Sequence, residues 1–193
     1  MLRKTARPFK GQAPEGVFQT VDVGTGPSNA WISEQAHKSP GRRYAAVDPA
    51  FKSYVQTKLA LERFGVLAEP TTLSQFLEKM LANNWKTRHF NFRMPDPKNK
   101  WGSYDFRNFF SVAKKVMFRG GKIFFTTESP AFIDFVSRLA KEEGFTPGRS
   151  AEITRPEEIR TLDERSFKRL GHKIFRFAIT NGRPWAKNKN PGN

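Results

Sequence analysis

The chain contains no cysteine and no long apolar run, and these absences exclude several classes of protein. Without cysteine it can form neither disulfides nor thiolate metal sites, which fits a reducing compartment. Since no stretch of about 20 apolar residues occurs, we expect no membrane span. The three histidines, His37, His89 and His172, share no ligand spacing, so we also expect no metal. We therefore expect a cytoplasmic protein, with an organelle matrix such as that of the mitochondrion as the alternative.

Acidic residues are scarce relative to basic ones. The chain has 34 lysines and arginines against 18 acids, a formal net charge of +16. This excess predicts a polyanionic partner, and RNA is the leading choice. The length of 193 residues suits one α/β domain, whose core we expect to depend on the 19 phenylalanines. We place this domain at residues 16–181, between a flexible basic arm at 1–15 and a flexible basic tail at 182–193.

The segment from Val21 to Ser28, Val-Asp-Val-Gly-Thr-Gly-Pro-Ser, reads as a buried strand that enters a glycine turn and then a helix. Gly24 and Gly26 allow the backbone to approach a ligand closely, and Asp22 is placed to hold one end of it. Asp48 ends the next expected strand, where a carboxylate can accept hydrogen bonds from ribose hydroxyls. Together these residues predict a cofactor that contains adenosine.

Expected strands and helices alternate along the chain. The strands are expected at 17–23, 43–47, 66–67, 88–92, 122–127, 152–153 and 173–179, and the helices at 29–37, 51–64, 73–81, 104–117 and 131–143. Alternation implies a parallel sheet with right-handed crossovers. No helix of good length is expected between the last two strands, so we expect them to pair antiparallel. The result is an α/β class I methyltransferase (Rossmann-like) fold: a mostly parallel seven-stranded sheet, an antiparallel C-terminal hairpin and helices on both faces. This closing hairpin favours S-adenosylmethionine over a nicotinamide cofactor.

Four segments resemble the tRNA (guanine-N7)-methyltransferase family. Phe92 to Lys100 is similar to its Phe-Pro-Asp-Pro-Trp motif, and Gly121 to Glu128 to a strand that ends in Thr-Asp. Thr161 to Glu164 fits its Thr-x-x-Glu motif, and Arg169 to His172 its Arg-Leu-Gly-His segment. The likeness covers residues 17–180, and the last two motifs are the most diagnostic.

The resemblance implies a role for each matching position. It makes Asp96 the catalytic aspartate, in contact with the cofactor as well. It places the cofactor against Asp22, Asp48 and Thr72, and the substrate against Lys100, Glu128, Thr161 and Glu164. Two departures stand out, because Lys98 replaces the motif tryptophan and the family's basic run after the motif is absent from residues 101–107.

Basic residues are concentrated near the two ends of the chain instead. We expect RNA, either tRNA or rRNA, to contact Arg3, Lys4, Arg7, Arg165, Lys168 and Arg169. The sequence leaves open whether a partner subunit supplies further RNA contacts. It also leaves two alternatives open: a catalytically inactive RNA-binding protein on this scaffold, such as a ribosome or ribonucleoprotein component, and a methyltransferase for a different RNA or a protein.

Overall fold

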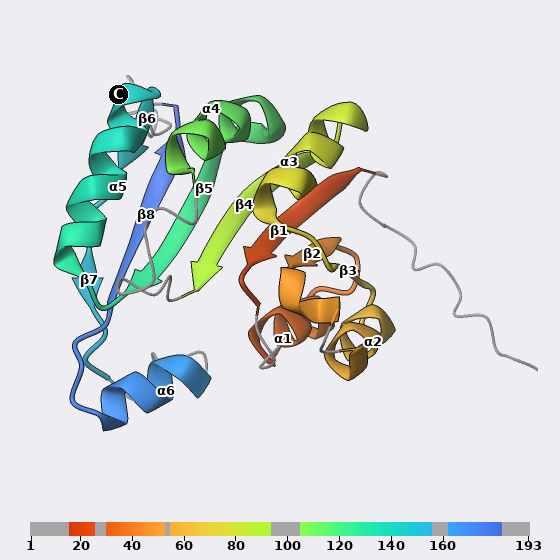
Figure 1. Ribbon diagram of the computed structural model, residues 1–193, viewed down its shortest axis with the longest axis horizontal. Helices are drawn as coiled ribbons and strands as arrows, with labels where there is room; N and C mark the ends of the chain where they lie inside the picture. The colour runs from red at the N-terminus through yellow and green to blue at the C-terminus, as the bar shows by residue number, and fades with distance from the viewer. Residues whose placement is uncertain (1–15, 26–29, 53–54, 94–104, 156–161, 183–193) are drawn as a thin grey trace, which may run out of the picture.

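The structure is a computed structural model that describes residues 16–25, 30–52, 55–93, 105–155 and 162–182 (Figure 1). Seven strands lie side by side in the order β3-β2-β1-β4-β5-β8-β6, and the short β7 also pairs with β8. The pairs among β1 to β5 are parallel, and every pair made by β8 is antiparallel. The expected sheet, with its antiparallel C-terminal closure, is confirmed.

The first half of the chain forms three parallel strands with helices between them. The elements are β1 (Val17–Val23), α1 (Ala30–Lys38), β2 (Tyr44–Val47), a 3-10 turn (Pro49–Lys52), α2 (Val55–Arg63) and β3 (Val66–Glu69). The helix expected over 51–64 is thus shorter and preceded by a separate turn. Of the apolar residues in this range, Phe51 and Leu61 are buried, but Val55 and Leu59 are exposed.

The second half begins with two longer strands. The elements are α3 (Leu73–Ala82), β4 (Lys86–Arg93), α4 (Phe106–Val116), β5 (Met117–Thr127) and α5 (Pro130–Glu142). Thr72 is the N-cap of α3 and forms a capping box with Gln75. Strand β5 begins five residues earlier than expected, at Met117, directly after α4.

The C-terminal part contains a helix that was not expected. It consists of β6 (Phe145–Pro147), β7 (Ala151–Glu152), α6 (Leu162–Arg169) and β8 (Phe175–Asn181). The segment in which no helix of good length was expected thus holds a helix of eight residues, while the expected antiparallel pairing of the strands on either side of it is confirmed. Helix α6 has the sequence Leu-Asp-Glu-Arg-Ser-Phe-Lys-Arg, which is mostly charged and carries no apolar repeat to signal a helix.

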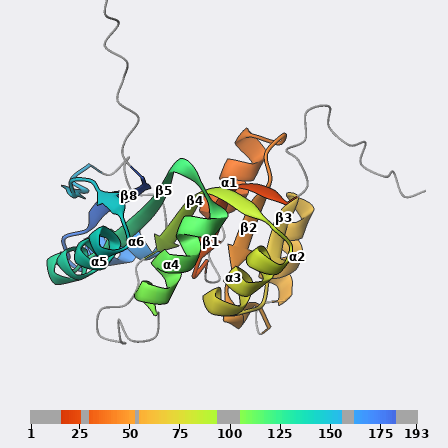
Figure 2. The ribbon, with the colours of Figure 1, turned by 90° about the horizontal axis from the view of Figure 1, so that it is seen from above.

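Helices cover the two faces of the sheet unequally (Figure 2). Helices α3, α4 and α5 lie along one face, while α1 and α2 pack on the other face at the β2 and β3 end. The larger core lies under α3, α4 and α5, and the smaller core lies under α1 and α2. In the described part of the chain, the opposite face of β4, β5 and β8 is flanked by α1 and α6, and no helix covers it along its length.

A stack of phenylalanines crosses the middle of the larger core. Phe125 on β5 is opposite Phe92 on β4 and Phe177 on β8 in the strand register. Its ring is stacked on both, at centroid distances of 4.8 Å and 5.0 Å. Phe106 and Phe132 contact the same ring edge-on from α4 and α5. One side chain therefore joins the parallel strands, the antiparallel β8 and two helices.

Replacing this central ring should destabilise the protein strongly. We expect Phe125→Ala to lower the free energy of unfolding by about 3–5 kcal/mol, because it removes a buried ring and leaves a cavity. The measurement is urea denaturation followed by circular dichroism. Phe64→Ala is the matched control, since Phe64 is 51% exposed, and it should change stability by less than about 0.5 kcal/mol. Similar losses in the two variants would contradict a core centred on Phe125.

Candidate functional site

Asp22 fixes the glycine turn that follows β1. Its side chain is fully buried, at 0% exposure. Asn91 of β4 donates a hydrogen bond of 2.6 Å to its Oδ1, and the hydroxyl of Thr25 donates one of 3.1 Å to its Oδ2. Asp22 therefore connects the turn to the neighbouring strand β4 by hydrogen bonds. It positions the turn, and it is not among the residues that line the two cavities described below.

Gly24 gives the turn its shape. Its φ of +68° is in the left-handed region, which costs a residue with a Cβ about 1 kcal/mol or more. Its N–H donates to the carbonyl of Val47 at 3.0 Å, so the turn is held to β2 as well. The backbone after β1 is thereby fixed against both neighbouring strands.

Asp48 follows β2 at the same edge of the sheet and is 8% exposed. Its Oδ1 accepts a hydrogen bond of 2.8 Å from the N–H of Ala50, which lies in the 3-10 turn. Its own N–H donates to the carbonyl of Glu69 at 3.2 Å. The carboxylate is thus held at the end of β2, between Val47 and Pro49.

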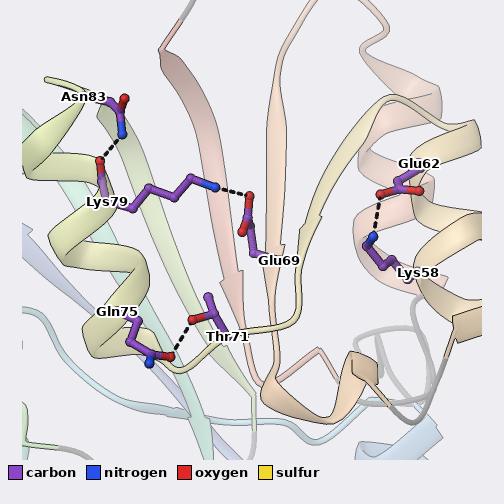
Figure 3. A network of polar contacts seen from close by, with 7 residues as sticks. All are labelled: Lys58, Glu62, Glu69, Thr71, Gln75, Lys79 and Asn83. Atoms are coloured by element: carbon purple, nitrogen blue, oxygen red, sulfur yellow. Dashed lines mark hydrogen bonds and ion pairs between the residues drawn. The ribbon is translucent and has the colours of Figure 1, made fainter.

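Polar contacts also fix the connection between β3 and α3 (Figure 3). Lys79 reaches back from α3 to Glu69, with Nζ and Oε1 2.7 Å apart. The hydroxyl of Thr71 donates to Oε1 of Gln75 at 2.7 Å. Together with the Thr72 cap, these contacts hold the first turn of α3 against the end of the sheet.

These elements enclose a cavity of about 270 Å³, which we name the edge cavity. Its lining comprises Val23, Gly24, Val47, Pro49, Thr72, Leu73, Ser74, Leu77, Asp105, Asn108 and Phe109. The walls are mostly apolar, and the polar groups come from the first turns of α3 and α4. Apolar walls with a few fixed polar groups are typical of sites for small organic ligands. The carboxyl ends of parallel strands are also where such folds bind ligands.

A second cavity, of about 290 Å³, lies on the open face of β4, β5 and β8, and we name it the face cavity. Asn91, Phe124, Arg176 and Glu164 are among its lining residues. Glu164 comes from α6 and is only 2% exposed. Its Oε2 is 2.7 Å from Nη2 of Arg176, and this ion pair holds a carboxylate at the cavity wall.

Glu128 and His172 form a separate pair. Oε2 of Glu128 and Nδ1 of His172 are 2.7 Å apart, an ion-pair distance when the imidazole is protonated. That oxygen accepts no hydrogen bond of acceptable geometry from the described residues. The ring of His172 also contacts Phe167 of α6 edge-on, at 5.4 Å. The pair therefore connects the end of β5 to α6, and neither residue lines the two cavities.

The structure brings some of the expected site residues together and separates others. Gly24 and Thr72 line the edge cavity, with Asp48 between two of its lining residues, whereas Glu164 lines the face cavity. Arg165, Lys168 and Arg169 lie on α6, and the first and last of these are exposed. The remaining expected residues lie outside the described residues: Arg3, Lys4, Arg7, Gly26, Asp96, Lys100 and Thr161.

Sequence reasoning missed several polar residues of the two cavities. Asn91 and Arg176 were not expected there, because their roles depend on partners distant in the chain, Asp22 and Glu164. Asp105 did carry a signal, since it precedes an apolar-periodic helix and accepts from the N–H of Asn108 as an N-cap. Among the described residues, no group of histidines and acids is arranged to hold a metal ion, and no helix is long and apolar enough to cross a membrane.

Comparisons with known proteins identify the fold. No protein-family model matches the chain, and no curated protein matches its sequence. The 16S rRNA methyltransferase KamB matches with a TM-score of 0.61 at 15% identity, over 86% of this chain and 88% of that one. An antibiotic-related methyltransferase matches with a TM-score of 0.60 at 14% identity, over 86% and 87%.

A third structure is similar over the same extent. The 16S rRNA (adenine(1408)-N(1))-methyltransferase of Catenulisporales acidiphilia, solved with S-adenosylmethionine, matches with a TM-score of 0.57 at 16% identity, over 89% and 88% of the two chains. At these identities the likeness shows the fold alone. The chain has the class I methyltransferase fold, as expected.

A double-mutant cycle tests the role of Asp22. We expect Asp22→Ala and Asn91→Ala to couple by about 1.5–3 kcal/mol, the range for a hydrogen bond to a charged group. The measurement is the free energy of unfolding of the wild type, both single variants and the double variant. Asp22→Ala combined with the distant Phe64→Ala is the control, and these effects should add within about 0.5 kcal/mol. A coupling as small as in the control would show that Asp22 does not hold β4.

Proposed function

We propose that this chain binds S-adenosylmethionine in the edge cavity and methylates RNA. The observation that carries the proposal is the edge cavity itself, which lies at the carboxyl ends of β1 and β2 beside a left-handed glycine. The class I methyltransferase fold supports the cofactor. RNA is supported as the substrate by the excess of basic residues and by the fact that two of the similar structures are 16S rRNA methyltransferases.

The residues of the edge cavity fit the chemistry of this cofactor. Val47, Leu77 and Phe109 offer apolar walls to the adenine ring. Asp48 is the acceptor for the ribose hydroxyls, and Gly24 lets the ligand approach the backbone. When bound, S-adenosylmethionine supplies an electrophilic methyl group. What the chain contributes is orientation of the ligand and exclusion of water.

For the substrate, the motif resemblance makes guanine N7 of tRNA the first target to test, and the rRNA methyltransferases of the same fold make rRNA the second. Guanine N7 is already nucleophilic, so transfer needs alignment more than a strong base. Positive charge develops on the purine during alkylation, and nearby carboxylates stabilise it. We assign this role to one of three carboxylates, Asp96, Glu128 or Glu164. The ion pair with Arg176 fixes the carboxylate of Glu164 at the wall of the face cavity.

A second candidate function is RNA binding without methyl transfer. The sequence observation that favours it is the departure of the motif after β4, where Lys98 replaces tryptophan and the basic run is missing. On this alternative the chain would keep its affinity for RNA but would show neither cofactor binding nor turnover.

Cofactor binding is tested by calorimetric titration with S-adenosylmethionine. We expect micromolar binding by the wild type and at least a tenfold loss, or about 1.4 kcal/mol, in Asp48→Asn. Asparagine keeps the oxygen that accepts from Ala50, so the local turn should remain. Glu62→Gln is the matched control, since Glu62 is an exposed acid on α2, pairs with Lys58 of the same helix and does not line the cavity. Absence of heat and of a ligand-induced thermal shift in the wild type would contradict cofactor binding.

Methyl transfer is tested with labelled cofactor on unmodified tRNA and on rRNA fragments. We expect Asp96→Ala to lower turnover by about 10²-fold, with cofactor affinity within a few fold of the wild type, because the interaction it removes forms in the transition state. Glu164→Gln should also lower turnover. A wild type that binds both cofactor and RNA but labels neither RNA pool would favour the inactive alternative.

A further inference from the structure

The open face of the sheet is hollowed along its length. A cavity of about 230 Å³ shares Trp31, Asn91 and Phe124 with the face cavity. It shares Gln19, Arg42 and His89 with a larger cavity of about 600 Å³ at the amino ends of β1, β4 and β5. The cavities of about 230 Å³ and 600 Å³ form one trough. The trough begins at the amino ends of the strands, away from the edge cavity, and runs toward the face cavity.

The trough is strongly basic. Arg42, Arg88 and Arg119 line it, and Lys122 is exposed next to it on β5. Within the described residues, none of these four cations takes part in an ion pair, and no acidic side chain lines the trough. Burial lowers the pKa of His89, and the charges of three neighbours lower it further: Lys122, Arg88 and Arg42. The local potential is therefore positive, and no acid of the described part of the chain neutralises it.

Aromatic rings are exposed along the same trough. Phe118 and Phe124 are 38% and 36% exposed, which is high for phenylalanines on a sheet. The guanidinium of Arg88 lies over the ring of Phe118 at 5.4 Å, and the ring of Phe124 contacts His89 at 5.5 Å. Rings that alternate with cations offer stacking surfaces for bases beside cations that bind phosphates.

Both ends of the described chain reach the basic end of the trough. At the first end, Gly16 is followed by Val17, which lines the trough. At the other end, Gly182 lies beside Arg119, which also lines it. The sequence before this point contains Arg3, Lys4, Arg7 and Lys10 against one acid, Glu15. The sequence after it contains Arg183, Lys187 and Lys189 and no acid. Because both segments are basic like the trough, repulsion disfavours either one as its occupant. A polyanion would instead be attracted by the trough and by both segments.

We propose that the trough binds a single-stranded stretch of RNA, with its phosphates on Arg42, Arg88, Arg119 and Lys122 and its bases against Phe118 and Phe124. This site goes beyond the proposed function, because it lies away from the edge cavity and requires no methyl transfer. Where the RNA is also the substrate, the trough leads it toward the face cavity and Glu164. A single strand fits better than a duplex, since stacking on rings requires unpaired bases.

The test measures binding of a fluorescently labelled, unstructured RNA 12-mer to the full chain by anisotropy across a salt series. We expect the triple variant Arg42→Gln, Arg88→Gln, Arg119→Gln to bind at least tenfold more weakly. The slope of log affinity against log salt should also fall by about 2, because each phosphate neutralised on a single strand adds about 0.7 to that slope. The matched control is Lys115→Gln, Arg138→Gln, Lys141→Gln, which removes the same charge from positions on α4 and α5. Its affinity should fall less than threefold.

A second variant separates stacking from charge. Phe124→Ala should weaken binding of the 12-mer at least fivefold and leave the salt slope unchanged. Equal losses of affinity in the two triple variants would overturn the proposal, as would equal binding of duplex RNA or effective competition by poly-glutamate, which would indicate a protein partner. Calorimetry with S-adenosylmethionine on the same variants keeps the two proposals apart, because the trough variants should retain cofactor affinity and Asp48→Asn should retain RNA affinity.

Discussion

The site depends on a carboxylate buried beneath it. Asp22 is inaccessible to solvent and is hydrogen-bonded to Thr25 in the glycine turn and to Asn91 on β4. Burying a carboxylate is costly unless it is paired, so the arrangement persists only while both donors stay in place. The same contacts fix Gly24 at the mouth of the edge cavity and Asn91 at the wall of the face cavity. One buried side chain thus sets the relative position of the two cavities.

The phenylalanine core explains how the sheet tolerates an open face. Phe92, Phe125 and Phe177 stack across three strands on the side of α4 and α5, so that side alone provides a continuous apolar core. The opposite side of β4, β5 and β8 is then free to carry cations and exposed rings. This asymmetry gives the molecule two polar regions, an acid-bearing edge at the carboxyl ends of the strands and a basic trough across the open face.

Much of the fold follows from local sequence patterns. Strand β1, the glycine turn and the Thr72 cap were predictable because buried strands, glycines and capping residues act over a few neighbouring positions. The order of helices and strands then predicted the sheet. Helix α6 escaped prediction because its residues are mostly charged and it is stabilised through long-range contacts such as that of Glu164 with Arg176.

The candidate site was less predictable than the fold. Asp48 does lie at the end of a strand and Thr72 does cap a helix, since strand ends and caps can be read locally, and their contact with a cofactor stays a prediction. The inward turn of Asp22 toward Asn91 was not, because these residues are 69 positions apart in the sequence. The same applies to the trough, whose cations come from separate strands and loops. Their convergence depends on the register of the sheet, which no local pattern reveals.

The most direct test of the account is a crystal structure of the chain with S-adenosylhomocysteine, the product left after methyl transfer. The account predicts electron density for the nucleoside in the edge cavity, against Gly24 and Thr72, with the ribose at Asp48. An edge cavity filled by the protein's own side chains, or a ligand bound elsewhere on the molecule, would contradict it.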